Sequence, residues 1–329
     1  MMNGNKQKKY NNPVLATITG IRDLFKKHET VGVLSPGDRL DGKTVFIDGA
    51  SSGLGFAIAT DVARRGAKVI MACRSGIPQK GQKIIAITGN NDVHMLPVDL
   101  SDLDSIRSMV TVLKSRYGIP DTIILNAGIV PKKSRQTKQG LEEMFVVNYL
   151  AKFYFIQLLW QDLKSATNND KGKRRIIFVT SESHRNPEKF EWEIFGKYRE
   201  YGIKKTMELY GYYKLSLVTF AVELSRRLNP DGAVNCSVFA MCPGPVNTNI
   251  ARDAPKIFHP LLKIVFSIFF RSPGKAAVPV VYLAASKDEE GKPFDYLFLM
   301  SRKDPDAKAL DPANGSRLWS LSGSLLSRF

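Results

Sequence analysis

The stretch "KTVFIDGASSGLGFAIATDVARRGAKVIMACR", residues 43–74, decides the fold. An apolar run, "TVFI", leads into a glycine-rich turn. An alanine-rich segment with apolar residues at helical spacing follows, and a second apolar run, "AKVIMAC", comes next. A strand, a helix and a second strand in this order form a βαβ unit, so we expect two parallel strands in one sheet.

The alternation of strand and helix patterns continues along the chain. Further strands are predicted at residues 94–100, 121–128, 174–181 and 233–244, and further helices at 103–117, 140–163, 210–228 and 272–286. The strands are continuous apolar runs, which is typical of strands buried on both faces. We therefore predict an α/β fold: a single-domain, Rossmann-type, doubly wound parallel sheet with helices on both faces.

The glycine-rich turn "DGASSGLG" follows the first predicted strand. Glycines let the backbone approach an anion closely, and the start of the next helix offers free N–H groups and a partial positive charge. In a doubly wound sheet, ligands bind at the carboxyl ends of the strands, where this turn lies. A turn that only connects two elements is the alternative. The residues predicted to contact a dinucleotide pyrophosphate are Gly49, Ser51, Ser52, Gly53, Leu54 and Gly55.

The second strand of the unit ends at Arg74, where an acidic residue would bind the ribose 2′-hydroxyl of NAD. An arginine can instead hold a 2′-phosphate through charge-assisted hydrogen bonds, so NADP(H) is expected in preference to NAD(H). A surface arginine that merely ends a strand is the alternative. Asp99, followed by Leu100, could accept a hydrogen bond from the adenine amino group or cap the next helix, although Asp102 is the better cap.

Three tyrosines and a lysine lie together in "ELYGYYKLSLVTF", residues 208–220. Tyr210 alone stands four positions before Lys214, so these two share a helix face. Tyr212 and Tyr213 are expected to pack or to line the rim of a pocket. A free phenol titrates near pH ~10, and a neighbouring ammonium lowers its pKa. The pair is therefore a candidate for proton exchange at neutral pH, although the same spacing also arises by chance.

A set of motifs occurs in a fixed order over roughly residues 40–300. GxxxGxG follows the first strand, "NAG" the fourth, a serine the fifth and "PGPVNT" the sixth, with YxxxK on the helix between the last two. In this order the motifs resemble the short-chain dehydrogenase/reductase family. The segments "MACR", "SESHR" and "SRLWSLSGSLL" are most similar to its retinol-dehydrogenase-like and WW-domain-oxidoreductase-like branch, whose members typically handle apolar carbonyls or alcohols.

The resemblance implies a role for each matching residue. Tyr210 would exchange a proton with the reacting oxygen, and Lys214 would hold the nicotinamide ribose and lower the tyrosine pKa. Ser181 would hydrogen-bond the substrate oxygen, with Ser183 as the alternative. Asn148 would complete a proton relay through a water, or else be a structural residue. The other residues that the resemblance assigns to the cofactor are Asn126, Ala127, Gly128, Pro243, Gly244, Val246 and Thr248.

Two features depart from the family pattern. Asp48 stands where threonine is usual, and a carboxylate beside the pyrophosphate turn would weaken cofactor binding unless it is hydrogen-bonded or bridged. The interval between Ser181 and Tyr210 is longer than in short family members, and residues 190–209 are expected to form an added flap at the pocket.

The amino-acid composition limits the classes of ligand that the protein is expected to bind. The net charge of +17 favours polyanions, anionic cofactors or acidic membrane surfaces, and the basic runs read most simply as solvated loops. The three cysteines form no CxxC pair and the four histidines are scattered, so no metal is expected. Nucleic-acid binding is not expected, because no aromatic platform lies among the basic runs. A cytoplasmic, reducing location fits the cysteine content.

The chain is expected to divide into three parts. Residues 1–38 form a basic, partly amphipathic N-terminal extension and 39–300 a dinucleotide-binding and catalytic domain, within which 252–271 form an apolar lid. A polar C-terminal tail, 301–329, follows. No stretch is long enough to span a bilayer. Peripheral membrane contact through 13–27 or 257–270 stays open beside packing on the body or in a homodimer.

The expected function is NADP(H)-dependent interconversion of a carbonyl and an alcohol on an apolar small-molecule substrate, such as a retinoid, steroid or lipid. Reduction of a carbon–carbon double bond is one alternative, since "GASSGLG" with "VIMACR" also resembles protochlorophyllide reductases. A nucleotide-sensing or scaffold protein that keeps the fold without turnover is another.

Overall fold

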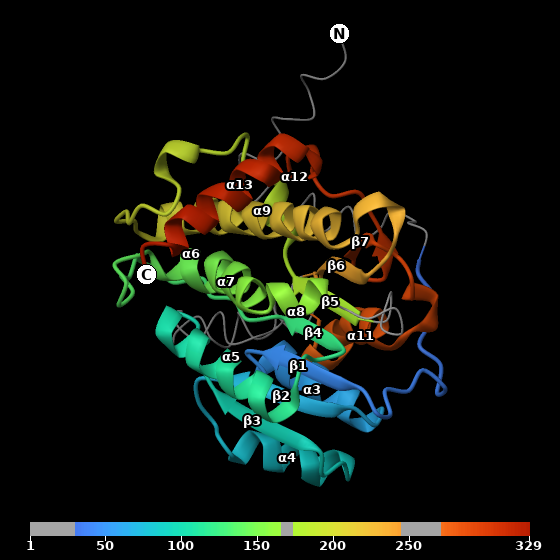
Figure 1. Cartoon of the computed structure of the whole chain (residues 1–329). Coiled ribbons are helices and arrows are strands. Elements are labelled where there is room, and N and C mark those ends of the chain that lie inside the picture. Colours follow the sequence, from blue (N-terminus) through green and yellow to red (C-terminus); the bar gives the residue numbers. More distant parts are fainter. Residues whose placement is uncertain (1–29, 166–173, 245–270) are drawn as a thin grey trace.

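The computed structural model describes residues 30–165, 174–244 and 271–329. Its centre is one eight-stranded sheet with the strand order β3-β2-β1-β4-β5-β6-β7-β8 (Figure 1). Strands β1 to β7 are parallel to their neighbours, and β8 is antiparallel to β7. The strands are β1 Thr44–Asp48, β2 Lys68–Cys73, β3 Val93–Pro97, β4 Thr122–Leu125, β5 Arg174–Val179, β6 Cys236–Cys242, β7 Phe294–Phe298 and β8 Ser301–Arg302.

Helices connect the parallel strands. The α-helices are α3 Gly53–Arg64, α4 Gln79–Thr88, α5 Leu103–Tyr117, α6 Glu143–Phe145, α7 Ala151–Leu158, α8 Trp160–Lys164, α9 Ile203–Leu228, α11 Pro273–Ala285, α12 Ala307–Leu310 and α13 Pro312–Leu326. One turn of π-helix, η1 Val146–Leu150, joins α6 to α7. Short 3₁₀ turns are η2 Glu182–Arg185, η3 Trp192–Ile194, η4 Pro230–Gly232 and η7 Lys287–Glu289.

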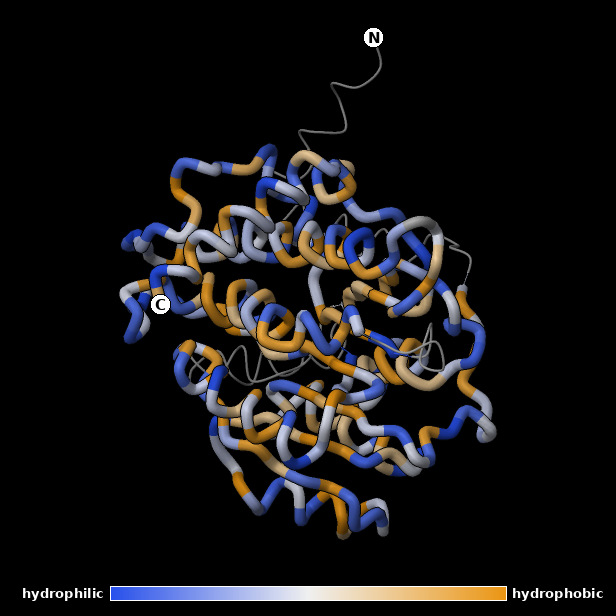
Figure 2. Tube along the Cα trace, viewed as in Figure 1, coloured by the Kyte–Doolittle hydropathy of each residue, from blue (hydrophilic) through white to orange (hydrophobic). Residues whose placement is uncertain are grey.

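The sheet has a hydrophobic core on each face. Along β1, Phe46 packs in the core shared with α5, α7 and α9, and Ile47 packs in the core shared with α3 and α11. Both side chains are fully buried because successive strand residues point to opposite, covered faces. Figure 2 shows hydrophobic residues along the strands and hydrophilic residues in the outer loops. The predicted doubly wound α/β fold is confirmed.

The strand order reverses at β1. Strand β2 lies on one side of β1 and β4 on the other, with Ile47 paired to Met71 and to Ile124. The connections therefore leave the sheet in opposite directions from this point. In doubly wound sheets the region outside the carboxyl ends of the strands at such a point, here called the crevice, is where ligands bind. The glycine turn and the "NAG" segment both begin there.

Helix α9 begins earlier than the sequence pattern indicated. It starts at Ile203, after Gly202, and not at Tyr210. The second part of the predicted flap, residues 203–209, is therefore the first two turns of this helix. The first part, residues 190–202, stays outside regular α-helix and anchors itself through Phe190 and Tyr201, which are both buried.

Residues 301–329, assigned by the sequence to a polar tail, contain β8, α12 and α13. Helix α13 lies along α9 (Figure 1). Its Ser322 hydroxyl is 2.6 Å from the Tyr149 hydroxyl in a buried hydrogen bond, and the ring of Trp319 lies 4.4 Å from the Arg227 guanidinium. The many serines and glycines in the α13 sequence obscure the helical spacing of its few apolar residues, so the sequence pattern indicated a polar tail.

Candidate active site

The glycine turn lies between β1 and α3. Gly49 and Gly53 adopt positive φ values of 62° and 53°, a region that L side chains rarely occupy. A Cβ on Gly55 would lie 2.4 Å from the Gly49 carbonyl oxygen and 2.6 Å from Asn126 Nδ2. Ser52 precedes α3 without a side-chain cap, so the first N–H groups of the helix have no capping side chain. The turn therefore offers an anion a close approach to backbone donors.

The "NAG" segment closes the other side of the crevice. The Asn126 side chain donates to the Asp48 backbone oxygen at 3.1 Å and ties the end of β1 to the segment after β4. A Cβ on Gly128 would lie 3.2 Å from Asn148 Oδ1 and 3.7 Å from Lys214 Nζ. The crevice thus brings the predicted residues Asn126, Gly128, Asn148 and Lys214 together.

Asp48 does not face the pyrophosphate turn as an unpaired carboxylate. Its side chain is 3% exposed, and Oδ1 accepts hydrogen bonds from the backbone N–H groups of Asn126 at 2.5 Å and Ala127 at 2.6 Å. Oδ2 lies 3.6 Å from Nζ of the equally buried Lys152. The carboxylate is both hydrogen-bonded and bridged, so the obstacle to cofactor binding that the sequence raised is absent.

Arg74 and Asp99 lie side by side beyond the glycine turn. The Arg74 side chain is exposed, and its guanidinium is 3.9 Å from the Asp99 carboxylate. Asp99 accepts from both the backbone and the hydroxyl of Ser101. Asp102, the predicted cap, accepts from the Asp104 N–H at the start of α5. The Arg74 guanidinium is thus free to turn toward an anion without breaking a close ion pair.

Tyr210, Ser181 and Lys214 meet at the carboxyl end of β5. The Ser181 and Tyr210 side chains are near enough to influence each other, and the Ser181 hydroxyl lies 3.0 Å from the Ser183 hydroxyl. Lys214 Nζ lies 5.6 Å from the centroid of the Tyr210 ring and donates to the Val179 carbonyl at 3.1 Å. One turn of helix therefore separates a phenol and an amine on the same face, with a hydroxyl opposite the phenol.

Burial governs the protonation of this group. It raises the pKa of the half-buried Tyr210 phenol above its usual range, and the nearby Ser181 side chain opposes this rise. Burial also lowers the pKa of Lys214 to about 7, an effect that the positive charge of Lys152 reinforces and Cys242 and Asp48 oppose. The sequence predicted that Lys214 lowers the Tyr210 pKa. Desolvation has the larger effect, because both groups are buried, and the Tyr210 pKa is raised instead. The Tyr210 phenol is therefore neutral at pH 7.

Asn148 sits within the π-helix η1 and is fully buried. Its Oδ1 accepts from the Ile129 N–H at 2.8 Å, and its Nδ2 donates to the Ile129 carbonyl at 2.9 Å. Both ends of the amide are thus used to hold the chain just after Gly128. A π-turn at this position is a common feature of functional sites, because it re-aims side chains and carbonyls.

His184 is a site residue that the sequence did not single out. It is fully buried, and burial lowers its pKa to about 4, so the ring is neutral at pH 7. Its Nε2 accepts from the Asp306 N–H at 3.1 Å, and its Nδ1 therefore donates to the Ser181 carbonyl at 2.8 Å. His184 thus holds the backbone of Ser181. Only its position three residues after the serine could have pointed to it.

The segment after β6 is described only in part. Pro243 and Gly244 follow the strand, and Gly244 has a positive φ of 72°. Val246 and Thr248, which were also predicted to contact the nicotinamide, lie outside the described residues, as do the lid 252–270 and residues 1–29. In the part of the chain that the structure describes, no cluster of metal-ligating side chains occurs.

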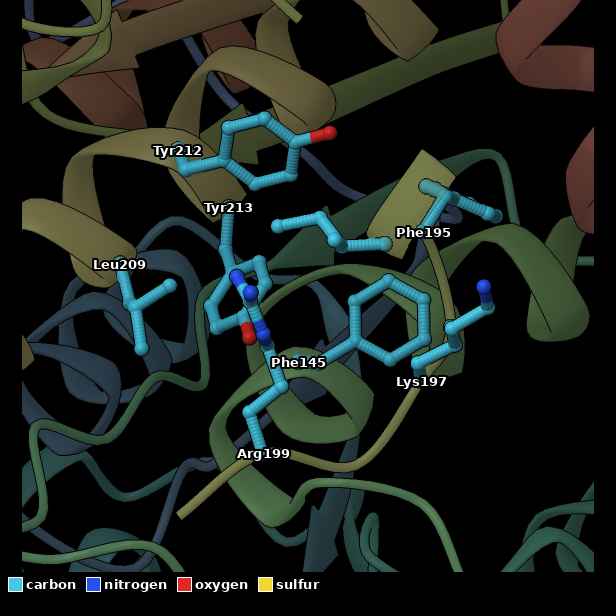
Figure 3. A pocket seen from close by; sticks show the side chains of 9 residues that line it. Phe145, Phe195, Lys197, Arg199, Leu209, Tyr212 and Tyr213 are labelled. Atoms are coloured by element: carbon cyan, nitrogen blue, oxygen red, sulfur yellow. The ribbon is translucent and has the colours of Figure 1, made fainter. Parts of the chain in front are cut away.

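One pocket lies apart from this crevice. It is lined by Phe145, Ile194, Phe195, Gly196, Lys197, Arg199, Leu209, Tyr212 and Tyr213. Figure 3 shows aromatic rings and Leu209 around it, with Lys197 at one side and the Arg199 side chain extending toward the rings. Tyr212 and Tyr213 are both buried and line this separate pocket. Neither Tyr210 nor Ser181 contributes to its wall.

Comparison with known proteins decides the family. A family model described as short chain dehydrogenase matches residues 43–192. Retinol dehydrogenase 13 of Homo sapiens is 32% identical over 325 residues, which cover 95% of this chain and 93% of the relative. The chain belongs to the short-chain dehydrogenase/reductase family. The WW domain-containing oxidoreductase of Gallus gallus is 31% identical over 93% of this chain and 73% of its own, so the predicted branch is confirmed as well.

Solved structures agree with this short-chain dehydrogenase/reductase fold. A protein from Mycobacterium paratuberculosis superposes with a TM-score of 0.64 at 27% identity, over 88% of this chain and 95% of its own. Pseudomonas aeruginosa RhlG, solved as an NADP active-site complex, superposes with a TM-score of 0.61 at 20% identity, over 81% and 98%. Among residues 30–165, 174–244 and 271–329, no helix has both the length and the hydropathy to cross a bilayer.

Proposed function

We propose that this short-chain dehydrogenase/reductase uses NADP(H) to interconvert a carbonyl and an alcohol on an apolar substrate, with Tyr210 as the acid/base group. The observation that supports this most directly is that Tyr210 and Ser181 lie near each other, with Lys214 one helical turn from Tyr210, at the strand edge beside the glycine turn. A substrate oxygen bound there would accept hydrogen bonds from both hydroxyls.

The residues of the crevice fit a dinucleotide. Gly49 and Gly55 let the turn pack tightly against itself and against the "NAG" segment, and the start of α3 supplies N–H donors for a pyrophosphate. Lys214 and the "NAG" segment would hold the nicotinamide ribose, and Arg74 would hold the 2′-phosphate. When bound, the cofactor supplies or accepts the hydride.

The protein's own groups would handle the proton. A neutral Tyr210 can donate to a carbonyl oxygen as negative charge develops there, and the Ser181 hydroxyl stabilises that charge at the same atom. Lys214, with a pKa of about 7, can replace the proton that Tyr210 has given up. His184 keeps Ser181 in place through the serine carbonyl.

An apolar substrate is supported by the surface of α9. Ile203 and Met207 are 68% and 49% exposed. They precede Tyr210 by seven and three residues, so all three lie along one face of the helix that carries the proton donor. Exposed apolar side chains leading to a polar centre favour an apolar molecule that is bound beside it. The similarity to retinol dehydrogenases, whose name denotes an apolar alcohol substrate, points in the same direction.

The experiment that tests this function is a screen of retinoid, steroid and fatty aldehydes with NADPH and with NADH, followed by product analysis. We expect NADPH consumption with formation of the alcohol from at least one aldehyde. A saturated product without a new hydroxyl would favour the double-bond reductase. NADPH binding without turnover of any carbonyl would favour the non-catalytic role.

Arg74→Ala tests the cofactor preference. We expect about a 10- to 100-fold loss of NADPH affinity with NADH affinity unchanged, because only the former gains a charge-assisted contact to the guanidinium. Isothermal titration with both cofactors measures it. Arg64→Ala is the matched control, since Arg64 is an exposed arginine on the far end of α3. A parent chain that binds NADH as tightly as NADPH would contradict the preference.

A further inference from the structure

The buried ion pair between Asp48 and Lys152 has no part in the mechanism above. Lys152 lies on α7 with 1% of its side chain exposed, and its Nζ is 3.6 Å from Asp48 Oδ2. The same Nζ donates to the carbonyl oxygen of Val147, within the π-helix. Burying a charged lysine is unfavourable, and burial lowers the Lys152 pKa. An ion pair kept in such a place despite this cost suggests a role in the site.

The pair joins three segments of the site. Asp48 ends β1 and accepts from the N–H groups of Asn126 and Ala127 after β4. Lys152 holds the carbonyl of Val147, the residue next to Asn148. The strand end, the "NAG" segment and the π-helix are therefore fixed to one another through two side chains. Since Lys152 reaches none of the reacting groups, its role is one of positioning.

The pair also sets the charge near Lys214. Among the described residues, the Tyr210 ring on the same helix lies 5.6 Å from that amine, and Lys152 on α7, Asp48 on β1 and Cys242 on β6 act on its protonation. Lys152 and Asp48 act on Lys214 with opposite sign, because one is a cation and the other an anion. Removing either alone should therefore move the protonation of Lys214 in opposite directions.

We propose that Lys152 is a positioning residue for the reaction, which holds the Asn148 segment against the "NAG" segment and places a second positive charge, balanced by Asp48, beside Lys214. This inference rests on the proposed function, since the protonation of Lys214 can change NADPH affinity only if Lys214 contacts the cofactor.

The test compares the pH dependence of NADPH binding in five proteins: the parent, Lys152→Met, Asp48→Asn, the double variant and Lys214→Met. Binding is measured by fluorescence titration across the neutral range, and folding is checked by circular dichroism. In the parent we expect a midpoint near pH 7 from Lys214. Lys214→Met should abolish this midpoint, which assigns it.

The single variants should shift the midpoint in opposite directions. Lys152→Met removes a cation and leaves the carboxylate, so we expect a rise of about one pH unit. Asp48→Asn leaves the cation uncompensated, so we expect a fall of similar size. Shifts in the same direction, or no shift in folded variants, would overturn the charge part of the proposal. If the pair were purely structural, the two variants would not shift the midpoint in opposite directions.

The double variant, Asp48→Asn with Lys152→Met, leaves no unpaired buried charge. It therefore allows the proposal to be tested even if a single variant does not fold. We expect its midpoint to stay near that of the parent. On the aldehyde found by the screen, kcat should fall at least tenfold with little change in KM, because the Asn148 segment is no longer held. Undiminished kcat in the folded double variant would overturn the positioning role.

The failure of the inference and that of the proposed function look different. A parent chain that binds no NADPH at any pH would overturn the proposed function and the inference with it. A parent that binds NADPH with a midpoint that none of the pair variants moves, and with kcat intact in the double variant, would overturn the inference alone.

Discussion

Replacing Tyr210 by phenylalanine should lower the rate of hydride transfer to an aldehyde about 10²- to 10⁴-fold while NADPH affinity changes little. The substitution removes only the hydroxyl, and proton transfer by a positioned group contributes a factor of this size. Ser181 would still hydrogen-bond the substrate oxygen but has no lysine one turn away. Single-turnover oxidation of bound NADPH, followed by its absorbance, measures the chemical step apart from product release.

Tyr212→Phe is the matched control for this prediction. Tyr212 lies on the same helix but lines the separate pocket, and its hydroxyl donates to the Glu191 carbonyl at 3.3 Å. We expect its rate to stay within a factor of about three of the parent, because exposed or peripheral hydrogen bonds contribute about 1 kcal/mol or less. If Tyr210→Phe reduces aldehydes as fast as the parent, Tyr210 is not the proton donor.

Replacing Gly55 by alanine should impair both the fold and cofactor binding. The added Cβ would lie 2.4 Å from the Gly49 carbonyl oxygen, a backbone atom that can move only if the turn opens. Forcing an extra methyl group into such a site costs about 1–3 kcal/mol. We expect a lower melting temperature and at least a tenfold weaker NADPH affinity, which correspond to about 1.4 kcal/mol in binding.

Gly323→Ala provides the matched comparison for Gly55→Ala. Gly323 lies within α13, and a Cβ there would meet no neighbouring atom within 4 Å. Alanine is a better helix former than glycine by about 0.5–1 kcal/mol, so this variant should be as stable as the parent or more so. Equal behaviour of the two variants in thermal unfolding and NADPH titration would mean that the turn at Gly55 is not tightly packed.

The sequence was informative wherever the physical cause is local. Continuous apolar runs predicted the parallel strands, since a strand covered on both faces has no polar side. The helical spacing of Tyr210 and Lys214 placed them on one face without any knowledge of tertiary structure. Gly55 was identified by a spacing that only a tight turn requires, and the structure shows the contacts behind it.

What could not be predicted depends on contacts between distant segments. Asp48 read as an obstacle to an anion because its partners, Lys152 and the backbone after β4, are remote in sequence. The pKa of Tyr210 was expected to fall beside a lysine, but the degree of burial decides its direction, and burial follows from packing. His184 likewise acquires its role only when Asp306 approaches its ring.

The packing of α13 against α9 bears on the order in which the molecule folds. The Tyr149–Ser322 hydrogen bond joins residues 173 positions apart, and the bond from Asp306 to His184 spans 122. Closing such long loops is entropically slow and comes after local helices have formed. We infer that the phenol and the serine reach their working positions late, once the two final helices have docked. A nascent chain would therefore carry its nucleotide crevice before it has a competent proton donor.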